Sequence, residues 1–331
     1  MASYALKRAA FPHISRPGTV AMLLLGTFAD LDLFLSQSSP SNYLDWHRTY
    51  LHSLVSALLL TALASAVVLR LRPGQSTPQI RPLSLVFAIL AAAALHLVLD
   101  LGQSLGIELL WPFTRRRFFL DWLPKPDLFI FAILLAAILL PGLAGLVTEE
   151  IGAKAKGPRG RVGAILGLAA MAVYIGARAL LHANAIATLD ARTYHGESAR
   201  RLAAFPEGPW LFTWLGVVET ERALAEVTVF LTPGSSFDPD SARMAHKPEP
   251  SEPLEAALRT ATAHRFLVVA RFPKASIERT PQGYRIELRA FPYGSWAAGS
   301  RVMAVIGSDA SGKVLEESLA WDPAAERVWW R

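Results

Sequence analysis

The stretch PLSLVFAILAAAALHLVLDLGQ, residues 82–103, decides the fold of this chain. It opens on a proline and stays apolar as far as His96 and Asp100. A helix needs about 20 consecutive apolar residues to cross the hydrocarbon core of a bilayer. The stretch therefore predicts a transmembrane helix, and its two ionisable residues predict a functional position near one end of that helix.

Four further segments have similar length and apolar character. Together with residues 82–103 they predict five spans, at about 17–36, 50–69, 82–103, 127–147 and 161–181. The composition agrees, because 52% of the residues are hydrophobic, 18% are charged and the mean hydropathy is +0.32. Such values are unusual for a soluble domain. Residues 1–182 are thus predicted to form an α-helical integral membrane domain.

The composition also excludes several classes of site and partner. The chain has no cysteine, which excludes disulfides, thiolate metal sites and a cysteine nucleophile, so any metal must bind His and carboxylate groups. The net charge is +6, but Lys and Arg lie mostly in short connectors between apolar runs. There they act as topology signals, and a nucleic acid partner is not expected.

The distribution of basic residues predicts an orientation. Connectors on one side hold Lys7, Arg8, Arg16, Arg70, Arg72, Arg81, Lys154, Lys156, Arg159 and Arg161. Connectors on the other side hold only Arg48, Arg115, Arg116, Arg117 and Lys125. The amino terminus is therefore predicted to be cytoplasmic, and five spans would place the carboxy-terminal region outside.

Residues 183–331 are predicted to form a small, β-rich, extracytoplasmic domain, because their apolar runs have the length of strands. The predicted strands are Phe266–Phe272, Tyr284–Phe291, Arg301–Gly307 and Lys313–Trp321. The polar, proline-rich segment Pro233–Pro253 is predicted to be a flexible loop. The histidines of this region have no partner at ligand spacing and are expected at its surface; they are His182, His195, His246 and His264.

Ionisable residues gather at three of the predicted span ends. They are Asp30 and Asp32, then His47, Arg48 and His52, then His96 and Asp100. Because consecutive spans alternate in direction, all three ends lie on one side of the bilayer. His96 and Asp100 are also four residues apart, so both reach one face of a helix. The set predicts one site for a metal or for protons, while each residue alone is compatible with an ordinary interfacial side chain.

Four ordered motifs resemble those of a known family. GTFADLD (Gly26–Asp32), HRTYLHSL (His47–Leu54), HLVLD (His96–Asp100) and LLWPF (Leu109–Phe113) are similar to the membrane-bound metal-dependent hydrolases, which are also described as LexA-binding, inner-membrane-associated hydrolases. The resemblance covers most of the chain. Thr49 and Leu51 depart from it, since they stand where the family has Gly and Thr.

The resemblance implies a bacterial inner membrane location and a divalent metal such as Zn²⁺. It marks Asp30, Asp32, His47, His52, His96 and Asp100 as metal ligands, with Arg48 and Ser53 as their neighbours. The family also looks distantly akin to zinc-dependent phospholipase C and P1-type nucleases, which implies a phosphoester substrate, either lipid or small molecule.

The function expected from the sequence is thus membrane-embedded, metal-dependent hydrolysis of a phosphoester. Asp32, His52 and Arg48 are the expected catalytic residues, and Arg48 or the run Arg115–Arg117 is expected to neutralise phosphate charge. Two alternatives remain open. The first is a non-catalytic metal-binding membrane protein that recruits a protein partner, and the second is a proton-coupled carrier.

Overall fold

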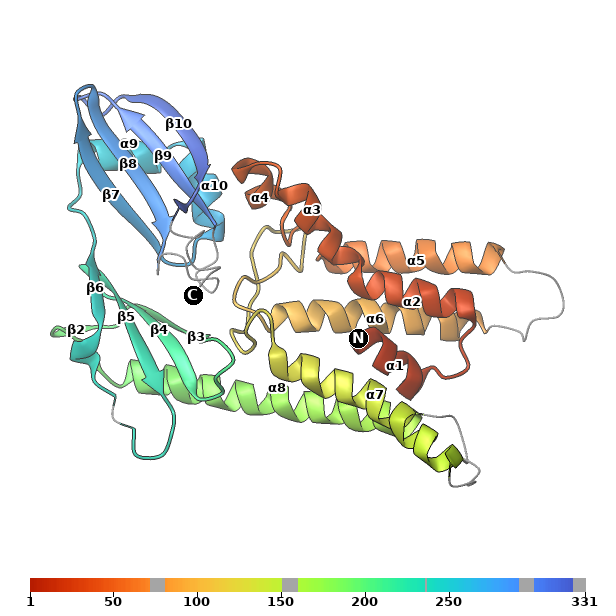
Figure 1. The fold of residues 1–331 in the computed structure, drawn as a ribbon. Helices are drawn as coiled ribbons and strands as arrows, with labels where there is room; N and C mark the ends of the chain where they lie inside the picture. The colour runs from red at the N-terminus through yellow and green to blue at the C-terminus, as the bar shows by residue number, and fades with distance from the viewer. Residues whose placement is uncertain (72–80, 151–159, 236, 292–300, 324–331) are drawn as a thin grey trace.

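The computed structural model of the protein describes residues 1–71, 81–150, 160–235, 237–291 and 301–323, without the side chains of residues 144–150. Figure 1 shows a helical part followed by a β-rich part. The helices are α1 (Ala2–Ala10), α2 (Arg16–Phe28), the 3-10 turn η1 (Ala29–Leu31), α3 (Asp32–Ser36), α4 (Pro40–Trp46), α5 (Leu54–Arg70), α6 (Pro82–Leu101), α7 (Leu128–Glu150) and α8 (Arg161–Asp190). The expected helical class of residues 1–182 is therefore confirmed.

The number of spans is smaller than expected. Among the described residues, three helical stretches are long and apolar enough to cross a membrane: Arg16–Ser36, α6 and α8. The predicted spans at 50–69 and 127–147 also form helices, but their apolar parts are shorter, at Leu54–Arg70 and Leu128–Leu143. The structure thus supports three spans of the five. It does not test the orientation, and Arg72, Lys154, Lys156 and Arg159 lie outside the described residues.

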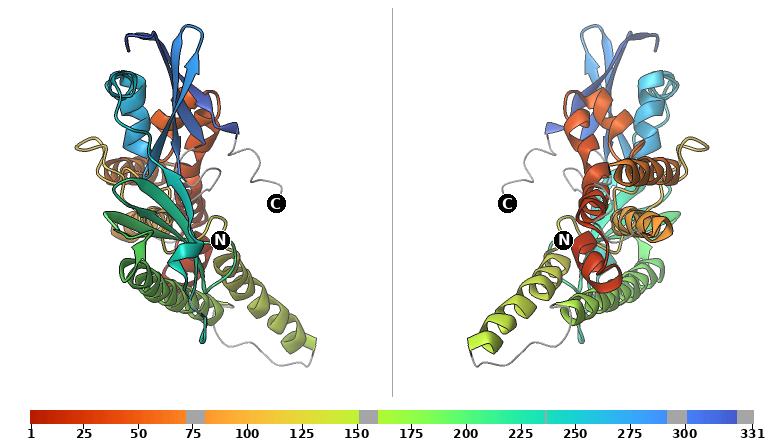
Figure 2. Two further views of the ribbon diagram at one scale, coloured as in Figure 1. Left: turned by 90° about the vertical axis from the view of Figure 1, so that its left-hand side faces the viewer. Right: turned by 90° about the vertical axis from the view of Figure 1, so that its right-hand side faces the viewer.

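Helices α2, α5 and α6 pack into one group. Met22, Leu85 and Ile89 are fully buried at its centre, while the opposite faces of the same helices expose Leu24, Leu59 and other large apolar side chains. Such outward-facing apolar surface is typical of helices that contact lipid. Viewed nearly along the helix axes, α7 points away from this group (Figure 2). Short α1 packs its Ala5 against α7 and α8.

The first half of the β-rich part is built on the end of α8. A four-stranded antiparallel sheet has the order β3 (Arg201–Pro206), β4 (Thr213–Glu219), β5 (Ala223–Phe230) and β6 (Arg243–His246). Ala185 and Leu189 of α8 pack against Trp214 and Val227 of this sheet. Helix α8 thus continues to Asp190, beyond the expected domain boundary at residue 182. Strands β1 (Thr193–Tyr194) and β2 (Glu197–Ser198) form a small separate sheet.

The second half is another antiparallel sheet covered by two helices. Its order is β10 (Val314–Trp321), β9 (Val302–Ser308), β8 (Gly283–Ala290) and β7 (Pro273–Thr280). Helices α9 (Glu252–Leu258) and α10 (Ala261–Val269) pack on it, and Phe266 meets Ile286 and Ile306 in the core. The expectation of a β-rich domain after the helices is confirmed.

Three local predictions were wrong. Phe266–Phe272 is not a strand, because Phe266 and Val269 lie in α10, which begins after the Thr260 side chain accepts a hydrogen bond from the Ala263 N–H. The segment Pro233–Pro253 is not a plain loop, because it contains β6 and the short turn η2 (Pro239–Ser241). His182 belongs to α8 and packs 5.5 Å from the ring of Trp214.

Candidate metal centre

The three groups of ionisable residues meet at the end of the helices that faces the β-rich part. Asp30 and Asp32 lie where α2 continues through η1 into α3. His47, Arg48 and His52 lie in the segment between α4 and α5, and His96 and Asp100 lie in the last turns of α6. Figure 1 shows the ends of α5 and α6 beside this segment.

Four of the six expected ligands form one compact group. Asp30, His52, His96 and Asp100 each offer one nitrogen or oxygen atom, and these atoms lie within 4.8 Å of one another. We call these residues the four-residue cluster. His52 Nε2 and His96 Nε2 lie 3.0 and 3.1 Å from Asp100 Oδ2. His96 Nε2 also lies 4.0 Å from Asp30 Oδ1. The structure thus contains a His/Asp group that could bind a metal ion.

The hydrogen bonding within this group fits a metal ion. His52 Nε2, His96 Nε2 and Asp100 Oδ2 are buried, yet none of them has a hydrogen bond of acceptable geometry within the described residues. A buried polar atom that lacks a well-directed hydrogen bond is costly, at about 1–3 kcal/mol. Two imidazole nitrogens and a carboxylate oxygen that converge in this way are the donor set that Zn²⁺ and similar divalent ions take.

Asp32 and His47 lie behind the four-residue cluster. Asp32 Oδ2 lies 3.0 Å from His52 Nδ1 and accepts a hydrogen bond of 2.6 Å from the backbone N–H of Arg48. Asp32 Oδ1 lies 3.5 Å from His47 Nδ1. A carboxylate on the far nitrogen of a metal-binding histidine fixes the tautomer and orientation of the ring. In this structure Asp32 therefore contacts the back of His52, away from the nitrogen that points into the cluster.

Arg48 does not face an open phosphate site. Its side chain is only 1% exposed, and its Nη2 donates to Asp100 Oδ1 at 3.0 Å and to Gln103 Oε1. The residue has a positive φ of 60°, which sends the chain sharply from α4 toward α5. The buried guanidinium holds Asp100 in place. The contacts of Arg48 therefore favour a role in positioning Asp100 over the expected direct role in binding phosphate.

Glu108 is an important residue that no sequence motif predicted. It is fully buried, and its carboxylate accepts hydrogen bonds from Thr49 Oγ1 at 3.2 Å and Arg115 Nε at 3.2 Å. Arg117 Nε lies 3.9 Å from the same carboxylate, while Arg117 Nη2 donates to the carbonyl oxygen of His47. The run Arg115–Arg117 thus braces the His47–Ser53 segment, and only Arg115 and Arg116 remain exposed.

Ser53 has a structural role in this segment. Its hydroxyl accepts a hydrogen bond from the Ser56 N–H at the start of α5. A serine at this position satisfies a backbone donor that the helix cannot pair itself. The contact fixes where α5 begins, directly after His52.

The second sheet and its helices contact the site through α4. Tyr43 stacks on the ring of His47 at 4.9 Å and meets the edge of Trp321 of β10 at 5.8 Å. Beside them, Arg265 of α10 donates hydrogen bonds to Ser41 and Asp45. The β-rich part thus touches Tyr43, which stacks on His47, and His47 in turn lies against Asp32.

Burial and neighbouring charges act in opposite directions on the two histidines of the connecting segment. Burial lowers the pKa of His47 to about 4, although Asp32 opposes the shift. Burial also lowers the pKa of His52, but contacts with Asp100 and Asp32 outweigh it and the net pKa is raised. His47 is consequently neutral near pH 7, whereas His52 lies between the carboxylates of Asp32 and Asp100.

One comparison with known proteins gives a match. A family model described as YdjM inner membrane protein matches residues 1–185, which include all of the residues described above except those of the β-rich part. No curated protein and no solved structure matches the chain.

Proposed function

This chain belongs to the YdjM inner membrane protein family, and we propose that it is a membrane-embedded, metal-dependent hydrolase that acts on a phosphoester. One observation carries the proposal. His52, His96 and Asp100 direct buried nitrogen and oxygen atoms, which lie 3.0–3.1 Å apart, toward one point beside the carboxylate of Asp30. A divalent ion held by these residues would lower the pKa of a water molecule and make it a nucleophile near neutral pH.

Unequal burial of the four residues supports catalysis over a purely structural metal site. Structural zinc sites are closed by four protein ligands, whereas catalytic sites leave one position open. The side chains of His52 and Asp100 are 1% and 7% exposed, but that of Asp30 is 58% exposed. A substrate therefore has access from the side of Asp30, while Arg48 and Asp32 hold the buried residues from the opposite side.

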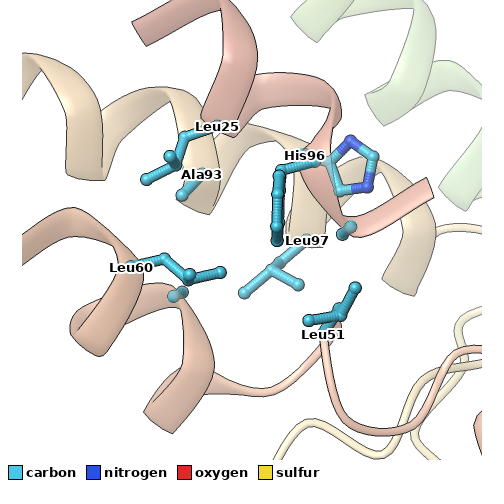
Figure 3. Close-up of a pocket in the computed structure, with 9 residues that line it drawn as sticks. Leu25, Leu51, Leu60, Ala93, His96 and Leu97 are labelled. Atoms are coloured by element: carbon cyan, nitrogen blue, oxygen red, sulfur yellow. The ribbon is translucent and has the colours of Figure 1, made fainter. Parts of the chain in front are cut away.

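The surroundings of His96 favour a substrate with a hydrocarbon portion. A small pocket with a volume of about 20 Å³ lies beside His96 between α2, α5 and α6. Its other lining residues are all apolar and include Leu25, Leu60 and Leu97 (Figure 3). A lipid phosphoester can place its apolar part against such a surface while its polar part reaches Asp30. The resemblance to phospholipases C points to the same substrate class.

The test uses the purified full chain in detergent or nanodiscs. Bound metal is measured in the native protein and in the His96→Ala and Asp100→Ala variants, together with turnover of a phosphodiester and a panel of phospholipids. We expect Zn²⁺ or a similar ion in the native protein, loss of it in both variants, and turnover only when metal is bound.

His264→Ala is the matched control, because His264 is exposed on α10 and far from the cluster in the chain. It should retain metal and activity. A native protein that binds no divalent ion at all refutes the proposal. Bound metal without turnover of any phosphoester refutes hydrolysis and leaves the non-catalytic metal-binding alternative.

A further inference from the structure

Large aromatic side chains are exposed at one end of the first sheet. Trp210 and Phe212, in the turn between β3 and β4, are 67% and 44% exposed, and Phe230 at the end of β5 is 54% exposed. Thr213 pairs with Phe230 across the sheet, so the three aromatic residues lie at the same sheet end. We call them the aromatic edge. Exposed apolar groups gathered in this way mark an interaction surface more often than a surface that faces water.

The turn that carries the aromatic edge is fixed to α8. Arg178 of α8 donates hydrogen bonds through Nη1 to the carbonyl oxygens of Trp210 and Leu211, at 3.2 and 2.9 Å. Its Nε donates to the carbonyl oxygen of Trp122 at 2.9 Å. Arg178 is only 1% exposed. The position of Arg178 along α8 therefore gives the depth of the turn relative to the spanning helices.

Two measurements along α8 place Arg178 at a membrane boundary. From Arg161, at the start of α8, to Arg178 the helix rises about 26 Å at 1.5 Å per residue. A hydrocarbon core is about 30 Å thick, so Arg178 lies near its far boundary. One turn earlier, Tyr174 donates a hydrogen bond of 2.9 Å to Asp127, the residue directly before the apolar helix α7.

The turn thus lies about 6 Å beyond the level at which α7 begins, since four residues separate Tyr174 from Arg178. The polar headgroup layer on each side of a bilayer is about 5–8 Å thick. On the face of α8 opposite buried Arg178, Val173 and Leu180 are exposed, so the helix still presents apolar surface at the depth of the turn. The aromatic edge is therefore level with the headgroups of the bilayer that α8 crosses.

We propose that the aromatic edge inserts into the headgroup layer of this bilayer and anchors the first sheet to the membrane surface. Tryptophan is enriched at this depth in membrane proteins because its ring is apolar while its N–H can still meet water or lipid. The occupant of the surface is lipid, since the edge lies at a depth at which α8 still exposes the large apolar side chains of Val173 and Leu180. The anchor is independent of the metal chemistry and goes beyond the proposed function.

The neighbouring carboxyl group suits this depth. Glu207 lines a shallow groove with Trp210 and Phe230, and burial, followed by the charge of Glu226, raises its pKa. A carboxyl group that protonates more easily is less costly at the edge of an apolar layer.

The absence of cysteine from the chain makes the test simple. Phe212→Cys gives a single thiol for a nitroxide label in the full chain, reconstituted in nanodiscs of mixed zwitterionic and anionic phospholipids. Collision rates of the label with oxygen, which concentrates in lipid, and with a nickel chelate, which stays in water, report its depth. The matched control is Ala310→Cys, in the exposed turn at the far end of β9 and β10.

We expect the ratio of oxygen to nickel collisions at residue 212 to exceed that at residue 310 several-fold, and to fall to the control value in protein without a bilayer. Equal ratios at the two positions in nanodiscs overturn the proposal. Protection of residue 212 from both reagents also overturns it, because protein, such as a second copy of the chain, would then cover the edge.

Discussion

Replacing Asp32 by Asn tests whether Asp32 binds the metal itself or positions the metal ligand His52. Asp32 receives the backbone N–H of Arg48 at 2.6 Å, and it lies 3.0 Å from His52 Nδ1 and 3.5 Å from His47 Nδ1. An amide keeps the size of the carboxyl group and can still accept one of these contacts. It loses the negative charge that favours a proton on His52 Nδ1 and thereby leaves Nε2 free to bind metal.

The expected effect follows from this indirect role. Loss of a carboxylate behind a metal-binding histidine typically weakens metal affinity roughly 10–100-fold. This corresponds to about 1.4–2.8 kcal/mol at 1.4 kcal/mol per tenfold change. Asp100→Ala removes an atom of the cluster itself, so it should weaken binding by more than the Asn variant does.

Zn²⁺ affinity is measured by competition with a chromogenic chelator on purified native protein, Asp32→Asn, Asp100→Ala and Asp45→Asn. Asp45 is the control, because it is a carboxylate on α4 that pairs with Arg265 outside the cluster. Native affinity in Asp32→Asn would show that Asp32 does not position His52. A loss as complete as in Asp100→Ala would show that Asp32 is itself a ligand, and the reasoning would fail.

Three further outcomes are expected from the contacts around the site. Glu108→Gln should lower the free energy of unfolding by about 3–5 kcal/mol, because it leaves the buried Arg117 without its counter-charge. Chemical denaturation in detergent would measure this loss, and an unchanged denaturation midpoint would contradict the prediction. Tyr43→Ala should cost about 3–5 kcal/mol by removing the ring between His47 and Trp321, whereas Tyr43→Phe, which keeps the ring, should melt nearly as the native protein does. Zn²⁺ at 100 times its Kd should add about 2.7 kcal/mol to native stability and nothing to that of Asp100→Ala; equal stabilisation of the two proteins would argue against the site.

The helical part could be predicted because its signal is local. A long apolar run has few alternatives to a buried or membrane helix, so each predicted span is mostly helical in the structure, although the first is divided into α2, η1 and α3. Whether a helix is long enough to cross depends on where its ends are capped. The Ser53 cap starts α5 after His52, and this shortens the second predicted span from its amino-terminal end.

The β-rich part was predicted only in outline. Strands β8, β9 and β10 were found because alternating or apolar runs stand between turn residues. The run Phe266–Phe272 is too short for its hydrophobic period to distinguish a strand from a helix. Packing of Phe266 against the second sheet favours the helix. Strands β3 to β5 were not identified, because their pairing is set by contacts with α8 that no local pattern shows.

The candidate site was predicted as a set of residues but not as an arrangement. His96 and Asp100 share a helix face, so their proximity follows from spacing alone. Asp32 and His47 lie apart from the four-residue cluster because the backbone at Arg48 is left-handed. A left-handed residue is usually predicted from a glycine, and this position has none. Glu108 was missed because a single acidic residue between aliphatic ones, Ile107 and Leu109, carries no spacing signal.

The continuity of α8 has a mechanical consequence. Its 30 residues run without a break from the membrane part into the core of the first sheet, where Ala185 and Leu189 are fully buried. The first sheet is therefore joined to the membrane part by a continuous helix and not by a flexible linker. Helix α8 is about 45 Å long in total. Helices tilt when the thickness of a bilayer changes. Any such tilt of α8 rotates the first sheet by the same angle. The lipid composition of the membrane therefore influences the orientation of the β-rich part.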